Sequence, residues 1–285
     1  VFFMTPGLAF FYGGLVRRKN VVNTMMACVF IMGLAVAMWV AFGYSLSFGG
    51  NHAGIIGDFR WAFLHGIGMN DVGPYADSIP HFVYIAFQMM FAIITPALIT
   101  GALVGRMKFK ALFLFIAFWS VLVYYPLAHM VWGEGGWLAS IGSVDFAGGN
   151  VVHISSGVTA LTLAILLGRR KGYNKVVYRV HNIPFVVLGA AMLWFGWFGF
   201  NAGSALKADG LAAHAFMTSA QLDDPGCDQR KETDTGRCIH RPCHRTGGDY
   251  AGCRICTDLV CFYHRRGSQP DLLFYGKTDQ TEIED

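Results

Sequence analysis

The chain has 285 residues, of which 54% are hydrophobic and only 14% are charged, and its mean hydropathy is +0.43. This balance excludes an ordinary soluble domain and indicates a polytopic membrane protein. The formal net charge of +4 does not indicate a nucleic-acid partner, because no basic stripe with interleaved aromatic residues occurs.

The composition changes abruptly near Gln221. Residues 1–221 contain 13 Lys and Arg and 6 Asp and Glu, whereas residues 222–285 contain 9 and 12. Cysteine follows the same division, with Cys28 alone in the first part and six cysteines in the second. We therefore expect a membrane domain over residues 1–220, joined to a polar tail over residues 221–285.

The apolar runs of the first part predict the membrane-spanning segments. Residues 1–16 resemble the end of a helix whose beginning is missing, because they are short for a span and lack the form of a signal peptide. We expect an interruption at Thr95–Pro96 in the third span, because proline removes a helix hydrogen bond. The full spans are expected at 21–48, 81–104, 111–132, 151–168 and 183–206.

Basic residues predict the orientation of these spans. Alternate connections contain eleven Lys and Arg, whereas the connections between them contain only Arg60. Since such an excess marks the cytoplasmic side, the N-terminus is expected outside and the loops 49–80 and 133–150 are expected to face outward. The eleven are Arg17, Arg18, Lys19, Arg106, Lys108, Lys110, Arg169, Arg170, Lys171, Lys175 and Arg179.

Glycine supplies a packing signal. The chain contains 35 glycines, and two pairs, Gly101 with Gly105 and Gly199 with Gly203, stand four residues apart. Small residues at this spacing let membrane helices approach closely. The spacing suits a tight bundle better than a set of isolated anchors.

The tail allows two interpretations. Its cysteines and histidines permit a zinc hypothesis, but their spacing is irregular and no helical or strand period accompanies them. A frameshifted, misassembled or disordered stretch that binds no metal is the favoured interpretation. The zinc candidates are Cys238, His240, Cys243, His244, Cys253 and Cys256.

Two ionisable residues stand at the start of the fifth span. A charged side chain inside hydrocarbon costs about 2.5 to 3.5 kcal/mol on insertion scales, so His153 is a candidate functional residue. It would otherwise hydrogen-bond to neighbouring backbone. Asp145 is interpreted as a structural cap, because a carboxylate before a helix accepts hydrogen bonds from free backbone N–H groups.

Aromatic residues gather near the outer ends of two spans. Phe87 and Phe91 are four residues apart and therefore share one helix face, and Trp132 ends the fourth span. Aromatic faces attract a desolvated cation by about 0.5 to 2 kcal/mol, so these residues are candidates for a cation site. The alternative is an aromatic belt at the membrane interface.

Four longer stretches, VYIAFQMMFAIITPALITGALVGRMKF, AHMVWG, DFAGGNVVHISSGV and WFGWFGFNAGS, occur in this order. In order and spacing they resemble ammonium transporters of the Amt/MEP/Rh superfamily, and most closely its bacterial Amt branch, over residues 1–220. The resemblance implies an all-α polytopic membrane protein of eleven helices, of which this chain contains a partial Amt-type bundle with a truncated first helix and five full spans. It also implies a multi-pass protein of the plasma or inner membrane, a homotrimer, a PII-type regulator as a further partner, no cofactor and no enzymatic activity.

The resemblance further assigns residues to a substrate path. It implies that Phe91, Trp132 and Ser204 bind ammonium at an outer recruitment site that Phe87 lines. Below that site, Phe91 and Phe200 would form a stacked gate. Ammonium would lose its proton near the gate, and ammonia would pass through a hydrophobic pore.

The pore itself is expected to be incomplete. His153 matches the first of two paired pore histidines, and Asp145 matches a largely structural acid of the family. The second histidine belongs to a later helix, and no apolar segment beyond residue 220 contains a candidate for it. The chain as printed is therefore expected not to transport. Glu134 adds an outward-facing acid that would enrich cations locally.

Two other functions remain open at the sequence level. An ammonium sensor would use the same membrane domain to signal through a cytoplasmic extension. A membrane haem protein would use His129, His153 or His181 as iron ligands, although these histidines do not recur as facing pairs on neighbouring spans.

Overall fold

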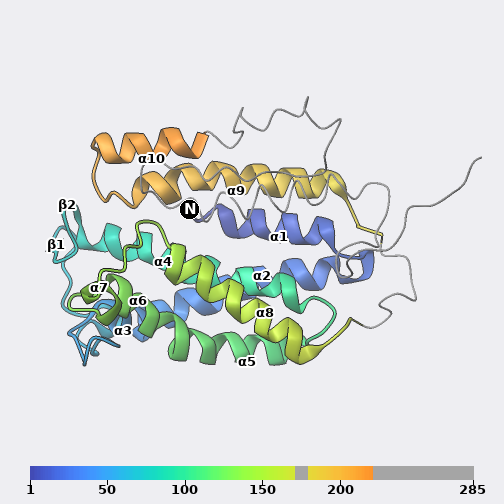
Figure 1. Ribbon diagram of the computed structural model, residues 1–285, viewed down its shortest axis with the longest axis horizontal. Coiled ribbons are helices and arrows are strands. Elements are labelled where there is room, and N and C mark those ends of the chain that lie inside the picture. The colour runs from blue at the N-terminus through green and yellow to red at the C-terminus, as the bar shows by residue number, and fades with distance from the viewer. Residues whose placement is uncertain (171–178, 221–285) are drawn as a thin grey trace, which may run out of the picture.

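The computed structural model describes residues 1–170 and 179–220, in which long helices run side by side in one bundle (Figure 1). The zinc candidates of the tail, together with Lys171 and Lys175, lie outside the described residues. Within the described residues, the α-helices are α1 (Met4–Leu15), α2 (Val21–Met38), α3 (Tyr44–Phe48), α4 (His81–Leu103), α5 (Phe109–Trp119), α6 (Tyr125–Trp132), α7 (Trp137–Ser140), α8 (Ser155–Leu167), α9 (Ile183–Gly203) and α10 (Gly210–Ala220).

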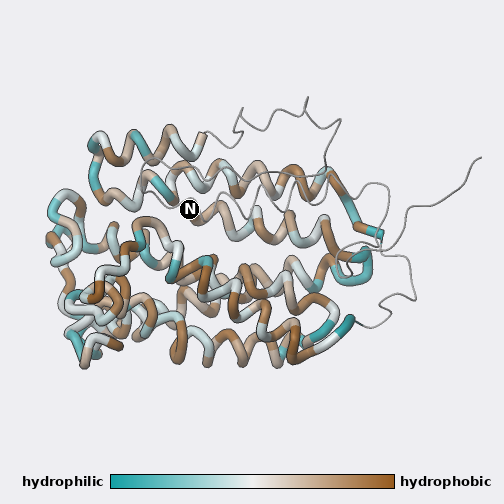
Figure 2. The backbone as a smooth tube through the Cα atoms, viewed as in Figure 1, coloured by the Kyte–Doolittle hydropathy of each residue, from teal (hydrophilic) through white to brown (hydrophobic). Residues whose placement is uncertain are grey.

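Five helical segments of this bundle are long and apolar enough to cross a membrane. They correspond to the five full spans predicted from the sequence, so the expected all-α polytopic architecture is confirmed for the described residues. The segments are Arg18–Phe48, His81–Leu103, Phe109–Ser140, Gly149–Leu167 and Ile183–Gly203. Hydrophobic residues cover the helices between the two ends of the bundle, where hydrophilic residues are concentrated (Figure 2).

Three of these spans contain a π-helical segment. Trp39–Gly43 joins α2 to α3, Ser120–Tyr124 joins α5 to α6, and Gly149–Ile154 leads into α8. Such wider turns are rare and occur frequently at functional sites. The third of them carries His153.

The predicted interruption at Thr95–Pro96 is wrong. Helix α4 continues from His81 to Leu103 with Pro96 inside it. The Thr95 hydroxyl donates a hydrogen bond to the Phe91 carbonyl at 2.5 Å, and this part of the helix is buried. A proline is tolerated in a membrane helix when its surroundings satisfy the backbone groups that it frees.

Helix α1 packs most extensively against α9, through glycines on both helices. A Cβ atom at Gly7 would lie 2.8 Å from the Cβ of Met192, and one at Gly14 would lie 2.6 Å from a methyl group of Val186. A Cβ atom at Gly189 would collide with the backbone of α1. The short first helix is therefore held by close backbone contact along α9.

The glycine pairs singled out in the sequence behave differently from one another. A Cβ atom at Gly101 would lie 2.7 Å from the ring of Tyr12, so this glycine does allow close packing. Gly105 has a φ of +70° and follows the end of α4. A Cβ atom at Gly199 would have no neighbouring atom nearer than 3.9 Å. The bundle is tight as expected, but its closest helix contact uses other glycines.

Polar connections divide between the two ends of the bundle (Figure 1). One end, which we call the loop end, is built from residues 49–80, 133–148 and 204–209 and includes an antiparallel pair of strands, β1 (Val72–Gly73) and β2 (Ala76–Pro80). The other, which we call the basic end, is built from the connections 16–20, 104–108 and 168–170. There, Arg106 donates to the Ala164 carbonyl at 3.1 Å.

Candidate functional site

Two phenylalanine rings from different helices stack at the centre of the candidate site. Phe91 of α4 and Phe200 of α9 have ring centroids 4.3 Å apart and an interplanar angle of 30°. Each side chain is only 1% exposed. The two residues are 109 positions apart in the chain, and the fold of the bundle brings their rings together.

Other aromatic rings surround Phe91. Phe87, one turn earlier on α4, has its ring centroid 4.9 Å from that of Phe91. Trp132, at the end of α6, approaches Phe91 edge to face with a centroid separation of 5.7 Å. Phe91 therefore contacts all three of the aromatic residues that the sequence singled out beside it.

Ser204 directly follows α9 and lies against the same group. Its hydroxyl donates to the Phe200 carbonyl at 2.8 Å. The preceding residue, Gly203, packs against Phe87 so closely that a Cβ atom would lie 2.8 Å from the ring. The Ser204 hydroxyl keeps its oxygen lone pairs for a further donor.

Asp145 organises the start of the π-helical segment. Its two carboxylate oxygens accept hydrogen bonds, 2.6 to 3.0 Å long, from four successive backbone N–H groups, those of Gly148, Gly149, Asn150 and Val151. These are contacts of a helix cap. The Asp145 carbonyl also accepts a hydrogen bond from the Trp132 indole N–H at 2.8 Å.

The turn at Gly148 requires glycine. Its φ is +95°, in the left-handed region that side chains disfavour. A Cβ atom there would also lie 2.7 Å from a methyl group of Val152. The Gly-Gly pair after Asp145 thus lets the chain fold back over the carboxylate.

His153 lies on the inner side of this turn. Its ring centroid is 6.3 Å from that of Phe200, with the rings tilted by 51°, and the residue is half-buried. Phe200 therefore lies next to both Phe91 and His153. The arrangement joins aromatic faces, which attract a cation, to an imidazole, which accepts or donates a proton near neutral pH.

A set of buried polar contacts at the loop end was not anticipated from the sequence. The Tyr44 hydroxyl and the Nε2 atom of His81 are 2.5 Å apart. The ring nitrogens of His129 lie 3.1 Å from the Ser47 carbonyl and 3.3 Å from Oδ1 of Asn51. These partners are 37 to 82 residues apart in the chain, so no local spacing could have indicated them.

The same contacts weaken the haem hypothesis, because both ring nitrogens of His129 face protein oxygens. Among residues 1–170 and 179–220, no group of three or more His, Cys, Asp or Glu side chains is arranged to hold a metal ion.

Comparison with known proteins gives a consistent result. A profile described as the Ammonium Transporter Family matches residues 1–221. The ammonium transporter of Bacillus subtilis is 52% identical over 219 residues, which cover 77% of this chain and 53% of the relative. The ammonium transporter of Mycobacterium bovis is 48% identical over 242 residues, covering 77% of this chain and 50% of the relative.

A solved structure agrees with the sequence relatives. The crystal structure of Saccharomyces cerevisiae Mep2 superposes with a TM-score of 0.70 at 33% identity, covering 78% of this chain and 51% of Mep2. The chain thus spans about half the length of the relatives that it matches. The profile match and these identities confirm the resemblance seen in the sequence, and the chain belongs to the Ammonium Transporter Family.

Proposed function

We propose that this protein takes part in carrying ammonium across a membrane, with residues 1–220 as its membrane domain. One observation carries the proposal. In the buried stack, Phe91 lies next to Phe87 and Trp132, and Phe200 lies next to His153. The relatives bear the name ammonium transporter, which supports the same substrate. No bond other than N–H is broken in this process, so the protein acts as a transporter and not as an enzyme.

Recruitment of the ion would use the aromatic side of the stack. The faces of Phe91 and Trp132 attract a cation that has lost part of its water, and Phe87 lines the same space. The Ser204 hydroxyl offers lone pairs to an N–H group of ammonium. This is the recruitment site that the sequence resemblance implies.

Loss of the proton would follow at the stack. A bare cation in a low-dielectric pore meets a Born cost on the order of 20 kcal/mol, whereas neutral ammonia loses only hydrogen bonds to water. Deprotonation therefore lowers the barrier: an N–H bond of ammonium would break, and the imidazole of His153 would take up the proton and pass it on separately from ammonia. The step also discriminates against potassium, which has no proton to lose. His153 would accept and donate hydrogen bonds along the pore beyond Phe200.

The stack itself would act as a gate. Phe91 and Phe200 are each 1% exposed and leave no passage between rings whose centroids are 4.3 Å apart. Conduction therefore requires rotation of at least one ring. Asp145 would serve as the structural acid that fixes Trp132 and the turn leading to His153.

The assembly and location also belong to this proposal. We place the protein in the plasma or inner membrane with the N-terminus and the loop end outside, as a homotrimer whose cytoplasmic face accepts a PII-type regulator. Arg17, Arg18, Lys19, Arg106, Lys108, Arg169 and Arg170 all belong to the basic end of the bundle, and this excess of positive charge supports the orientation. The sensor alternative depends on a signalling extension beyond residue 220, and no described residue favours it over transport.

A hybrid transporter tests the proposal. Residues 1–221 replace the matching half of the Bacillus subtilis ammonium transporter, and uptake of labelled methylammonium is measured in cells that lack their own ammonium carriers. We expect uptake by the hybrid, and loss of most of it on His153→Ala or Trp132→Ala.

A second hybrid, built on the Mycobacterium bovis transporter, guards against an incompatible junction. The abundance of each hybrid in the membrane is measured with a C-terminal fluorescent tag. If both hybrids reach the membrane at the level of their parents and neither takes up methylammonium, the proposed function is wrong.

A further inference from the structure

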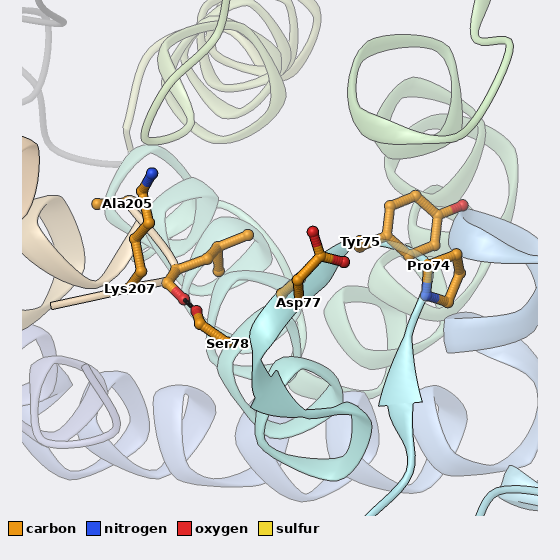
Figure 3. Close-up of a pocket in the computed structure, with 8 residues that line it drawn as sticks. Pro74, Tyr75, Asp77, Ser78, Ala205 and Lys207 are labelled. Atoms are coloured by element: carbon orange, nitrogen blue, oxygen red, sulfur yellow. Dashed lines mark hydrogen bonds between the residues drawn. The ribbon is translucent and has the colours of Figure 1, made fainter. Parts of the chain in front are cut away.

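A pocket of about 270 Å³ opens at the loop end, between strand β2 and the turn that follows α9 (Figure 3). Its walls are Pro74 to Ser78 on one side and Ala205 to Lys207 on the other. We propose that Asp77 makes this pocket an antechamber that gathers ammonium ahead of the aromatic recruitment site. The inference rests on the proposed transport of ammonium and adds a residue that neither the motifs nor the aromatic stack indicated.

The position of the pocket follows from the chain path. Strand β2 leads directly into α4, which carries Phe87 and Phe91, and the turn 205–207 directly follows α9, which carries Phe200 and ends next to Ser204. Both walls are therefore outward continuations of the two helices that form the stack. Seven residues separate Pro80 from Phe87, about 10 Å of helix, so the pocket lies a short distance outside the aromatic site.

The walls of the pocket are held in place. The Ser78 hydroxyl donates to the Leu206 carbonyl at 2.7 Å and so ties β2 to the turn after α9 (Figure 3). Leu206 has a φ of +57°, a conformation that is uncommon outside glycine and persists where neighbours fix it. The Tyr75 hydroxyl donates to the Phe48 carbonyl at 2.8 Å. Burial raises the pKa of Tyr75, so this wall contributes no charge.

Asp77 differs from four of the other five acids of the loop end. All six carboxylates of residues 1–221 belong to segments of this end, and four of them accept hydrogen bonds from backbone N–H groups. The carboxylate of Asp77 makes no hydrogen bond or ion pair with any residue in the described part of the chain, and it projects into the pocket (Figure 3). It is thus available to a mobile cation.

The neighbouring lysine does not cancel this charge. Lys207 forms an ion pair with Asp209, with Nζ and Oδ2 3.1 Å apart. A hydrogen bond from the Ala212 N–H, together with Lys207, lowers the pKa of Asp209, so Asp209 is ionised at neutral pH. Counted by formal charge, Asp77, Lys207 and Asp209 leave one net negative charge beside the pocket.

A single negative charge at the mouth of a path raises the local concentration of cations without tight binding. Over about 10 Å in water the attraction is small, so removal of the charge is expected to change the apparent affinity about two- to threefold at low ionic strength. The effect is expected to vanish at high salt, where the screening length falls to a few ångström.

The test uses the Bacillus subtilis hybrid and measures methylammonium uptake against concentration in a buffer of low ionic strength. Asp77→Asn is expected to raise KM about two- to threefold with an unchanged maximal rate, and Lys207→Gln to lower KM. Asp77→Glu keeps the charge and is expected to retain the parent KM. Asp71→Asn removes one carboxylate from the same end but outside the pocket, and is the matched control, with KM unchanged.

The outcomes separate the two proposals. If the unmutated hybrid transports but Asp77→Asn leaves KM unchanged, or if Asp71→Asn raises KM as much as Asp77→Asn does, the antechamber is wrong while the proposed function stands. The antechamber is also wrong if the shift in KM persists in about 0.5 M of an impermeant salt, where charges are screened within a few ångström. If the unmutated hybrids reach the membrane but take up no methylammonium, the proposed function is wrong and the antechamber is wrong with it.

Discussion

At the scale of single residues, Asp145 has the largest predicted effect on stability. Its carboxylate accepts hydrogen bonds from four backbone N–H groups at the start of the π-helical segment. Asp145→Ala leaves these donors without partners and is expected to lower the free energy of unfolding by about 2 to 4 kcal/mol. Thermal unfolding of the purified hybrid in detergent measures the loss.

Asp71 supplies the matched control for that experiment. Its carboxylate accepts a single hydrogen bond, from the Gly68 N–H at 2.7 Å, in an exposed loop. Asp71→Ala is expected to shift the unfolding temperature only slightly. Equal shifts for the two variants would contradict the capping role of Asp145, and a fully active, equally stable Asp145→Ala variant would contradict it more strongly.

At the scale of helices, contact between α1 and α9 depends on glycine. Gly189 faces the backbone of α1 near Phe11, and any Cβ atom there would overlap with it. Gly189→Ala is therefore expected to push the helices apart and to lower the free energy of unfolding by about 1 to 3 kcal/mol. The unfolding temperature of the hybrid in detergent is the measurement.

Gly33 of α2 provides the comparison, because a Cβ atom there would meet no atom within 4 Å. Gly33→Ala is expected to leave stability unchanged or to raise it by about 0.5 to 1 kcal/mol, since alanine favours the helix. Should Gly189→Ala melt at the same temperature as Gly33→Ala, the close contact of α1 with α9 is not a source of stability.

The helices also show what the sequence can and cannot predict. The five long spans were predicted to within a few residues at most ends, because a membrane demands about 20 consecutive apolar residues and the demand is local. The π-helical segments were not predicted, because they depend on packing, and on the hydrogen bonds of Asp145 in one case. Helix α10, with 11 residues, is too short to give the signal of a membrane span, and β1 and β2, with 2 and 5 residues, are too short to give a clear alternating pattern.

Some contacts of the candidate site could likewise be predicted from the sequence, and others could not. Phe87 and Phe91 share a helix face and could be paired from spacing alone. The stack of Phe91 on Phe200, by contrast, joins residues 109 positions apart, and only the family resemblance indicated it. Asp77 lies in a strand that was expected to be a loop, and its exposure to the pocket depends on the turn after α9.

At the scale of the whole molecule, charge is separated along the bundle. The loop end contains every carboxylate of residues 1–221, whereas the basic end has none, since its segments 16–20, 104–108 and 168–170 contain no Asp or Glu. Basic residues that flank membrane spans remain on the cytoplasmic side. The cytoplasmic leaflet is negatively charged, so the proposed orientation would also place the basic end against lipids of opposite charge.

Labelling from one side of the membrane tests this orientation. Met69 of the loop end is 84% exposed, so Met69→Cys in the hybrid is expected to react with a membrane-impermeant maleimide added to intact cells. Arg18→Cys at the basic end is expected to react only after the cells are opened. Cys28 is 0% exposed and serves as an internal residue that reacts in neither case. If Arg18→Cys reacts in intact cells and Met69→Cys does not, the proposed orientation is wrong and the aromatic site lies on the cytoplasmic side.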